Sequence, residues 1–120
     1  MRSIVTGGAG FIGSHFVDRL VSRGDDVLVL DNLSSGKAEF LAHHTSNVTL
    51  VNVDITDFDA ISPHFEGVDI VYHFAANPDI RLGTQITDTD LKQGTIATYN
   101  IVESMRIHNV PTLSLIHISE

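Results

Sequence analysis

The feature that most constrains this chain is a glycine-rich stretch near its start, between Ser3 and His15. A short apolar run precedes Gly8, Gly10 and Gly13, which have the spacing G-x-G-x-x-G, and an amphipathic segment follows them. This order predicts a strand, a tight turn and a helix, the arrangement in which backbone N–H groups at a helix start bind the pyrophosphate of a dinucleotide. Glycine clusters also occur in ordinary turns, so the interpretation of this motif depends on its context, the residues that follow it.

The second predicted strand supplies that context, because it ends on an acid. Val27 to Leu30 is apolar, and Asp31 follows it about 20 residues beyond the glycines. In a dinucleotide-binding unit an acid at this position binds the hydroxyls of the adenosine ribose, and its charge opposes the extra phosphate of NADP. We therefore expect NAD as the cofactor, with Lys37 in the next loop leaving NADP open. The alternative for Asp31 is a solvated loop aspartate.

Composition limits the classes of function. The chain has 120 residues, enough for one domain but short for a cofactor enzyme with its own substrate lobe. Its formal net charge of −8 disfavours nucleic acid and anionic lipid as partners. Because there is no cysteine, disulfides, thiolate zinc sites and cysteine nucleophiles are excluded. With no separate leader and no apolar run of membrane-spanning length, we expect a cytoplasmic protein.

Strand and helix patterns alternate along the chain. After the first strand, the expected strands are Val27–Asp31, Val48–Val53, Gly67–Phe74 and Thr112–Ser119. The expected helices are 12–23, a short one at 37–44, a segment at 56–65 that Pro63 disturbs, and a long one at Asp88–His108. Crossovers of this length predict an α/β fold: a Rossmann-type doubly wound parallel sheet of order 3-2-1-4-5, incomplete, with a dinucleotide across the carboxyl ends of its strands.

Some residues in this pattern have two interpretations. Asp54, after the third strand, is either a helix cap or an acceptor for the adenine amino group. His73 lies inside the fourth strand, which favours a hydrogen-bonded core histidine over a catalytic base. His43 and His44 point apart on a helix and are interpreted as a solvated helix end rather than a metal pair. In the long helix, the apolar residues expected to face the sheet are Leu91, Tyr99, Val102 and Met105.

Four stretches of the chain, read together, resemble one family. They are Thr6–His15, Asp31–Gly36, Asp54–Ile55 and His73–Pro78. In this order and spacing they resemble the extended short-chain dehydrogenase/reductases, specifically the NAD-dependent nucleotide-sugar epimerases and dehydratases, as far as about Pro111. The resemblance implies the NAD-binding half of an enzyme that moves a hydride from C4 of a nucleotide sugar to the nicotinamide and back to the other face. It also implies a nucleotide-sugar substrate and a homodimer for the full-length parent.

The resemblance implies roles for individual residues. Those that would hold the pyrophosphate are Gly7, Gly10, Phe11, Ile12 and Gly13. The residues at the adenosine ribose would be Asp31, Asn32, Ser35 and Gly36. The residues at the adenine ring would be Asp54 and Ile55. Those along the pyrophosphate and nicotinamide ribose would be Phe74, Ala75 and Ala76. Gly94 stands where the family usually has an asparagine, which removes a side-chain hydrogen bond near the nicotinamide ribose and places a weak helix former inside a helix.

The chain departs from the family in its catalytic residues. The family's base is a tyrosine with a lysine four residues later, helped by a serine after the fifth strand. Here the two tyrosines, Tyr72 and Tyr99, are followed at that distance by Ala76 and Glu103. A phenol with a pKa of about 10 is a poor base at neutral pH without such a cation. We expect these 120 residues to bind NAD weakly and without turnover; the alternatives are a non-catalytic nucleotide-binding module, or the front half of a 4,6-dehydratase or reductase.

The last eight residues, Leu113 to Glu120, have an unusual sequence for this family. Leu-Ser-Leu-Ile-His-Ile-Ser-Glu resembles the translation of a widely used sequencing-library adapter rather than the serine-rich end of the family's fifth strand. We therefore expect residues 1–112 to be the NAD-binding unit, and residues 113–120 to be a foreign tail that is apolar and β-branched enough to form a strand.

Overall fold

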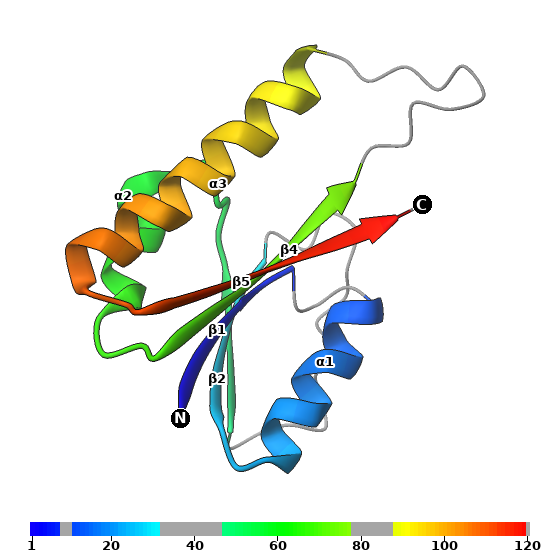
Figure 1. The fold of residues 1–120 in the computed structure, drawn as a ribbon, viewed down its shortest axis with the longest axis vertical. Helices are drawn as coiled ribbons and strands as arrows, with labels where there is room; N and C mark the ends of the chain where they lie inside the picture. Colours follow the sequence, from blue (N-terminus) through cyan, green and yellow to red (C-terminus); the bar gives the residue numbers. More distant parts are fainter. Residues whose placement is uncertain (8–10, 32–46, 78–87, 120) are drawn as a thin grey trace.

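A computed structural model describes residues 1–7, 11–31, 47–77 and 88–119, and in this part of the chain five parallel strands form one sheet (Figure 1). The strands are β1 (Arg2–Thr6), β2 (Asp26–Asp31), β3 (Val48–Asn52), β4 (Ile70–Asn77) and β5 (Thr112–Ser119). Their order, β3-β2-β1-β4-β5, confirms the order predicted from the sequence. All four neighbouring pairs are parallel.

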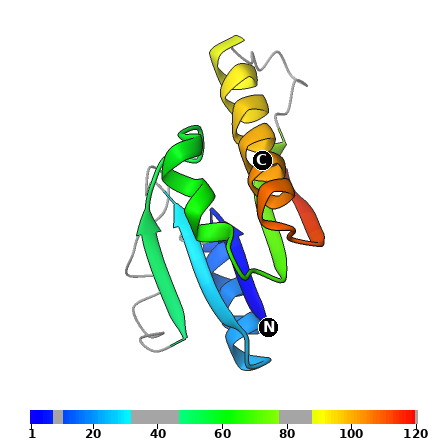
Figure 2. The same ribbon diagram turned by 90° about the vertical axis from the view of Figure 1, so that its left-hand side faces the viewer.

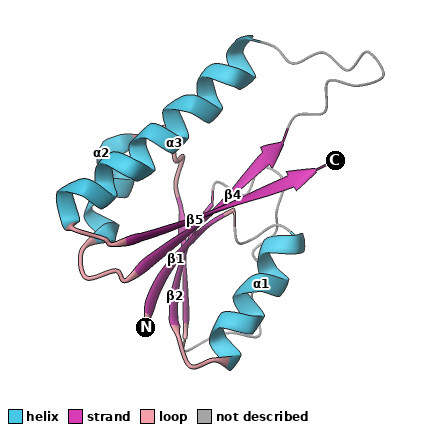
Figure 3. Cartoon of the chain, viewed as in Figure 1, coloured by secondary structure: helices cyan, strands magenta, loops and turns pink. Residues whose placement is uncertain are grey.

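Helices cover both faces of the sheet (Figure 2). Helix α1 (Phe11–Ser22) lies on one face, and α2 (Phe58–Ile61), the 3₁₀ helix η2 (Ser62–Phe65) and α3 (Asp88–His108) lie on the other (Figure 3). The core therefore consists of two clusters. Val17 and Leu20 of α1 pack with Tyr72 on the first face, while Phe65 and Ile101 belong to the cluster on the second. Residues 3–6 of β1 are all buried, because the strand is covered from both sides.

The start of β4 and the segment before it differ in detail from the sequence prediction. The strand begins at Ile70 rather than Gly67, because Gly67 has a φ of 76° and belongs to the turn that enters the strand. The segment predicted at 56–65 is divided into α2 and η2, with Pro63 in the first turn of η2. Proline tolerates such a position because the first N–H groups of a helix have no helical partner.

Helix α3 and strand β5 have the predicted bounds, but α3 is rotated relative to our expectation. Tyr99 is 64% exposed and Val102 48% exposed, so the prediction that they face the sheet was wrong. The buried face consists of Ala97, Asn100, Ile101, Ser104 and Met105. Small and polar residues fit against the sheet here, and the periodicity of large apolar residues therefore pointed to the wrong side of the helix. The side chain of Leu91 lies outside the described residues.

The remaining predicted segment, the helix at 37–44 with His43 and His44, lies outside the described residues. Among the helices that the structure describes, none combines the length and apolarity of a membrane span.

Candidate functional site

The carboxyl ends of the central strands bring the sequence-predicted residues to one edge of the sheet. Thr6, the last residue of β1, is paired with Leu30 of β2 and with His73 of β4. The residues that follow these three are Gly7, Asp31 and Phe74. The parallel register therefore places the start of the glycine turn, the acid after the second strand and the start of the Phe74–Ala76 segment beside one another.

Gly7 occupies a position that requires glycine. Its φ is 76°, and its N–H donates a hydrogen bond to the carbonyl oxygen of Leu30 at 3.1 Å. A Cβ at this position would lie 3.4 Å from the Cβ of Phe74. The positive φ and the close approach of β4 both disfavour a side chain, and this leaves the backbone bare where the chain turns away from β1.

The other pyrophosphate candidates are only partly described. Helix α1 begins at Phe11, so Phe11 and Ile12 form its first turn, and Gly13 is buried in the same helix. Gly10 lies outside the described residues, as do Asn32, Ser35 and Gly36 of the ribose set. Ala75 and Ala76 belong to the last part of β4, directly after Phe74.

Asp31 links the ends of β2 and β3. It is the last residue of β2 and is half-buried, and its carbonyl oxygen accepts a hydrogen bond from the N–H of Val53 at 3.2 Å. This bond extends the pairing of the two strands by one step beyond the register pair Asp31 and Asn52. It brings the adenine candidates Asp54 and Ile55 to the same edge as the acid.

The carboxylate of Asp54 is ordered by its own loop. Its Oδ1 accepts hydrogen bonds from the N–H of Thr56 at 2.9 Å and from the Thr56 hydroxyl at 2.7 Å. These bonds, the hydroxyl first, lower the pKa of Asp54 because they stabilise its charged form. The helix cap is Asp57, which accepts a hydrogen bond from the N–H of Ala60, so Asp54 does not cap α2. Asp54 is thus an exposed, ionised acceptor.

Ile55 is held by a residue that the sequence analysis missed. The side-chain amide of Asn100 in α3 donates a hydrogen bond to the carbonyl oxygen of Ile55 at 3.1 Å. Asn100 is buried, and Ile55 packs at the edge of the core cluster on the α3 side. A polar residue in the middle of a long helix was the only sequence signal for this contact, and it reads equally well as solvent-exposed.

His73 is a hydrogen-bonded core residue, which confirms the favoured interpretation. It is 3% exposed, and its Nδ1 lies 2.6 Å from the hydroxyl oxygen of Thr6. Its Nε2 lies 3.4 Å from the hydroxyl oxygen of Thr98 in α3.

Neither tyrosine of the chain lies in this group of residues. Tyr72 is buried against Phe16 of α1 with 4.7 Å between the ring centroids, and its hydroxyl oxygen lies 3.4 Å from Nη2 of Arg23. Tyr99 is exposed on α3. Gly94 is also exposed on α3, and a Cβ there would have no neighbour within 4 Å among the described residues.

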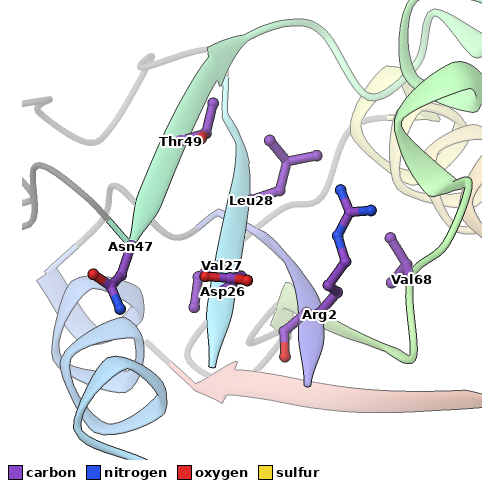
Figure 4. Close-up of a pocket in the computed structure, with 8 residues that line it drawn as sticks. Arg2, Asp26, Val27, Leu28, Asn47, Thr49 and Val68 are labelled. Atoms are coloured by element: carbon purple, nitrogen blue, oxygen red, sulfur yellow. The ribbon is translucent and has the colours of Figure 1, made fainter. Parts of the chain in front are cut away.

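A separate hollow of about 420 Å³ lies at the opposite end of the strands (Figure 4). Arg2 and Asp26, the first residues of β1 and β2, line it together with Asn47, and Arg2 extends toward the space between Leu28 and Val68. Because the strands are parallel, the hollow is at the amino edge of the sheet, away from Gly7 and Asp31.

Comparison with known proteins shows which family this chain resembles. Residues 3–119 match the family described as "NAD dependent epimerase/dehydratase family". The UDP-glucuronic acid decarboxylase 2 of Arabidopsis thaliana is 48% identical over 75 residues, which are 62% of this chain and 16% of the relative. Matches also include dTDP-glucose 4,6-dehydratases.

Solved structures of the same fold include two UDP-glucose 4-epimerases. The UDP-glucose 4-epimerase of Thermotoga maritima, crystallised with UDP-glucose, superimposes with a TM-score of 0.82 at 34% identity, covering 96% of this chain and 37% of that one. The UDP-glucose 4-epimerase of Thermus thermophilus in complex with NAD has a TM-score of 0.79 at 36% identity, covering 94% and 36%. The chain thus spans well under half the length of these relatives.

Proposed function

Because this chain belongs to the NAD dependent epimerase/dehydratase family, we propose that it binds NAD at the carboxyl edge of its sheet, as the cofactor-binding part of a nucleotide-sugar epimerase. The observation that carries the proposal is the meeting of Gly7 and Asp31 at the ends of the paired strands β1 and β2. A glycine turn that leads into the start of α1, beside a carboxylate, matches the chemistry of a dinucleotide, because the unpaired N–H groups of a helix start bind its pyrophosphate and its ribose hydroxyls donate to an acid.

We propose the roles of the remaining site residues from the resemblance to the family. The turn from Gly7 through Gly10 to Gly13, with Phe11 and Ile12, binds the pyrophosphate at the start of α1. Asp31 binds the adenosine ribose, with Asn32, Ser35 and Gly36 beside it. Asp54 accepts a hydrogen bond from adenine while Ile55 packs near the ring, and Phe74, Ala75 and Ala76 pass along the pyrophosphate and nicotinamide ribose.

The cofactor would supply the redox chemistry, accepting a hydride from C4 of the sugar and returning it. The residues of this chain bind and orient that cofactor. Two observations support a chain without its own general base: Tyr72 is packed in the core beside Arg23, and Tyr99 is exposed on the outside of α3. We infer that the 120 residues bind NAD without turnover. The parent reaction is 4-epimerisation, for which 4,6-dehydration and reduction are the alternatives within the family.

Isothermal titration with NAD and NADP tests the binding proposal on the chain as it stands. Asp31→Asn is expected to weaken NAD binding by about ten- to a hundredfold, the range for a hydrogen bond to a charged group. Asp26→Asn is the matched control, because Asp26 begins the strand that Asp31 ends and lies at the opposite edge. Equal affinities of the two variants, or no NAD binding by the wild type, would contradict the proposal. Incubation with UDP-glucose and NAD should give no epimerised product.

We also propose that the parent forms a homodimer through the outer face of α3. Four large apolar side chains are exposed on this helix, next to the ion pair of Arg106 with Glu103: Ile96, Tyr99, Val102 and Ile107. Apolar residues gathered on one exposed helix face favour a protein partner, and a second copy of the chain presents the same surface. We call this set the α3 outer face.

A further inference from the structure

The imidazole of His73 joins three elements beneath the glycine turn. His73 belongs to β4, Thr6 is the last residue of β1 and Thr98 lies in α3. The two ring nitrogens lie 2.6 Å and 3.4 Å from the hydroxyl oxygens of Thr6 and Thr98. A neutral imidazole has one donor and one acceptor nitrogen, and a hydroxyl fills either role, so both contacts are satisfied in either tautomer.

The residue after His73 holds the turn from the other face of the sheet. Phe74 packs edge-on against Phe16 of α1, with 5.4 Å between the ring centroids. Its Cβ is the atom that a side chain on Gly7 would approach to 3.4 Å. Consecutive residues of β4 thus hold Thr6 and Gly7 from opposite sides, His73 by hydrogen bonding and Phe74 by packing.

We propose that His73 is a positioning residue. Its hydrogen bonds link the end of β1 to α3 and thereby keep the Gly7 turn in its ligand-binding conformation. The side chain is buried and does not itself reach the ligand. Its effect passes through Thr6, whose backbone continues directly into Gly7. The role in ligand binding rests on the proposed function, whereas the effect on the turn does not, and the two are measured separately.

The first measurement is hydrogen exchange of two glycine amides in the ligand-free chain. The N–H of Gly7 is bonded to Leu30, and the N–H of Gly24, also a glycine of positive φ, is bonded to Val21 at the far end of α1. Thr6→Val removes the hydroxyl and keeps the shape of the side chain. We expect it to raise the exchange rate of Gly7 relative to Gly24 by about tenfold, because the buried Nδ1 of His73 loses its hydrogen-bond partner.

Four further variants make the measurement specific. His73→Asn retains a polar group near the position of Nδ1 and should restore part of the protection that His73→Leu loses. Ser104→Ala is the control, because it removes a buried hydroxyl from α3 that has no hydrogen-bond partner among the described residues. If a His73 variant fails to fold, Thr98→Val removes the longer contact and still reports on the link to α3.

The second measurement is NAD affinity of the same variants. We expect Thr6→Val to weaken binding about fivefold or more, and Ser104→Ala to leave it unchanged. A Gly7-to-Gly24 exchange ratio that does not change in Thr6→Val and Thr98→Val would overturn the positioning role. If the ratio changes but the wild type binds no NAD, the proposed function fails and the positioning of the turn stands. If the wild type and all variants bind NAD equally, His73 has no role in binding.

Discussion

Asn100 in the middle of α3 donates a hydrogen bond from Nδ2 to the carbonyl oxygen of Ile55 in the loop after β3, with 3.1 Å between the two atoms. The helix therefore supports the loop that carries both adenine candidates, Asp54 and Ile55. The contact joins residues 45 positions apart in the sequence. It connects α3, on one face of the sheet, with the adenine part of the candidate site.

Replacing Asn100 with leucine should destabilise the chain and loosen this loop. The substitution removes the donor and leaves the Ile55 carbonyl without it, so the free energy of unfolding should fall by about 1–3 kcal/mol. Urea denaturation measures the change. Val102→Ala, an exposed position on the same helix, is the control and should change stability by less than about 0.5 kcal/mol at a concentration where the chain is monomeric. Equal stability of the two variants would show that the hydrogen bond contributes nothing.

Acid should destabilise the chain partly through Asp25. This carboxylate is buried at the amino edge, where it accepts hydrogen bonds from Arg23 at 2.6 Å and from Ser3 at 3.2 Å. The Arg23 hydrogen bond is the main cause that lowers the pKa of Asp25 in the folded chain. The stabilisation is fully present above the unfolded pKa of about 3.9 and is lost as pH falls through the lower folded pKa.

Asp25→Asn tests this linkage. The variant should be less stable than the wild type at pH 7, because it loses the charge-assisted bond, and its stability should fall less as the pH drops below the unfolded pKa of about 3.9. Denaturant midpoints across this range provide the measurement. Parallel pH profiles for the two proteins would exclude Asp25 as a source of acid sensitivity.

Gly94 offers a simple way to stabilise α3. It is a helical residue without positive φ, and a Cβ there meets open space among the described residues. Gly94→Ala should raise the free energy of unfolding by about 0.5–1 kcal/mol through helix propensity. Gly24→Ala, also with open space but with a φ of +94°, should instead lower it by about 1–2 kcal/mol. Thermal melts that rank the two variants in the reverse order would refute this account.

The α3 outer face should drive self-association. We expect sedimentation velocity to show a concentration-dependent increase in mass, and Tyr99→Glu to abolish it by placing a charge among the apolar side chains. Arg19→Glu is the control, because Arg19 is an exposed residue of α1 on the opposite face of the sheet. A wild type that stays monomeric at all concentrations would remove the support for a dimer formed by this surface.

The sequence of the tail, from Leu113 to Glu120, leads to a prediction about the gene. In the structure β5 pairs with β4 along eight consecutive residues, from Thr112 opposite Ile70 to Ser119 opposite Asn77. We propose that most of this strand is foreign sequence whose apolar, β-branched composition suffices for pairing. Sequencing the source DNA through the junction should show a different continuation after about Thr112. A natural reading frame that contains these eight codons would disprove the proposal.

Helices and strands could be predicted from the sequence where the hydrophobic pattern was periodic and strong. The apolar runs of β1 and β2 and the bounds of α3 and β5 were predicted, because strands buried on both faces and long helices leave clear patterns. The burial of His73 was also predicted from its place inside an apolar strand.

The rest depended on contacts between distant residues. The orientation of α3 was misjudged because Ala97, Asn100 and Ser104 face the sheet while Tyr99 and Val102 face outward. Nothing local distinguishes a buried asparagine from an exposed one. Its hydrogen bond to Ile55 exists only once the third strand and the third helix are packed. The choice of Asp57 over Asp54 as helix cap likewise depended on where the chain turned after β3.

Among the described residues the sheet separates two hydrophobic clusters with no member in common, one containing Val17 and Leu20 and the other Phe65 and Ile101. Mutations in one cluster should accordingly change the free energy of unfolding independently of mutations in the other. Val17→Ala and Ile101→Ala, made together, should cost the sum of their separate penalties to within about 0.5 kcal/mol. One side of the molecule can therefore accumulate sequence change while the packing of the other is preserved.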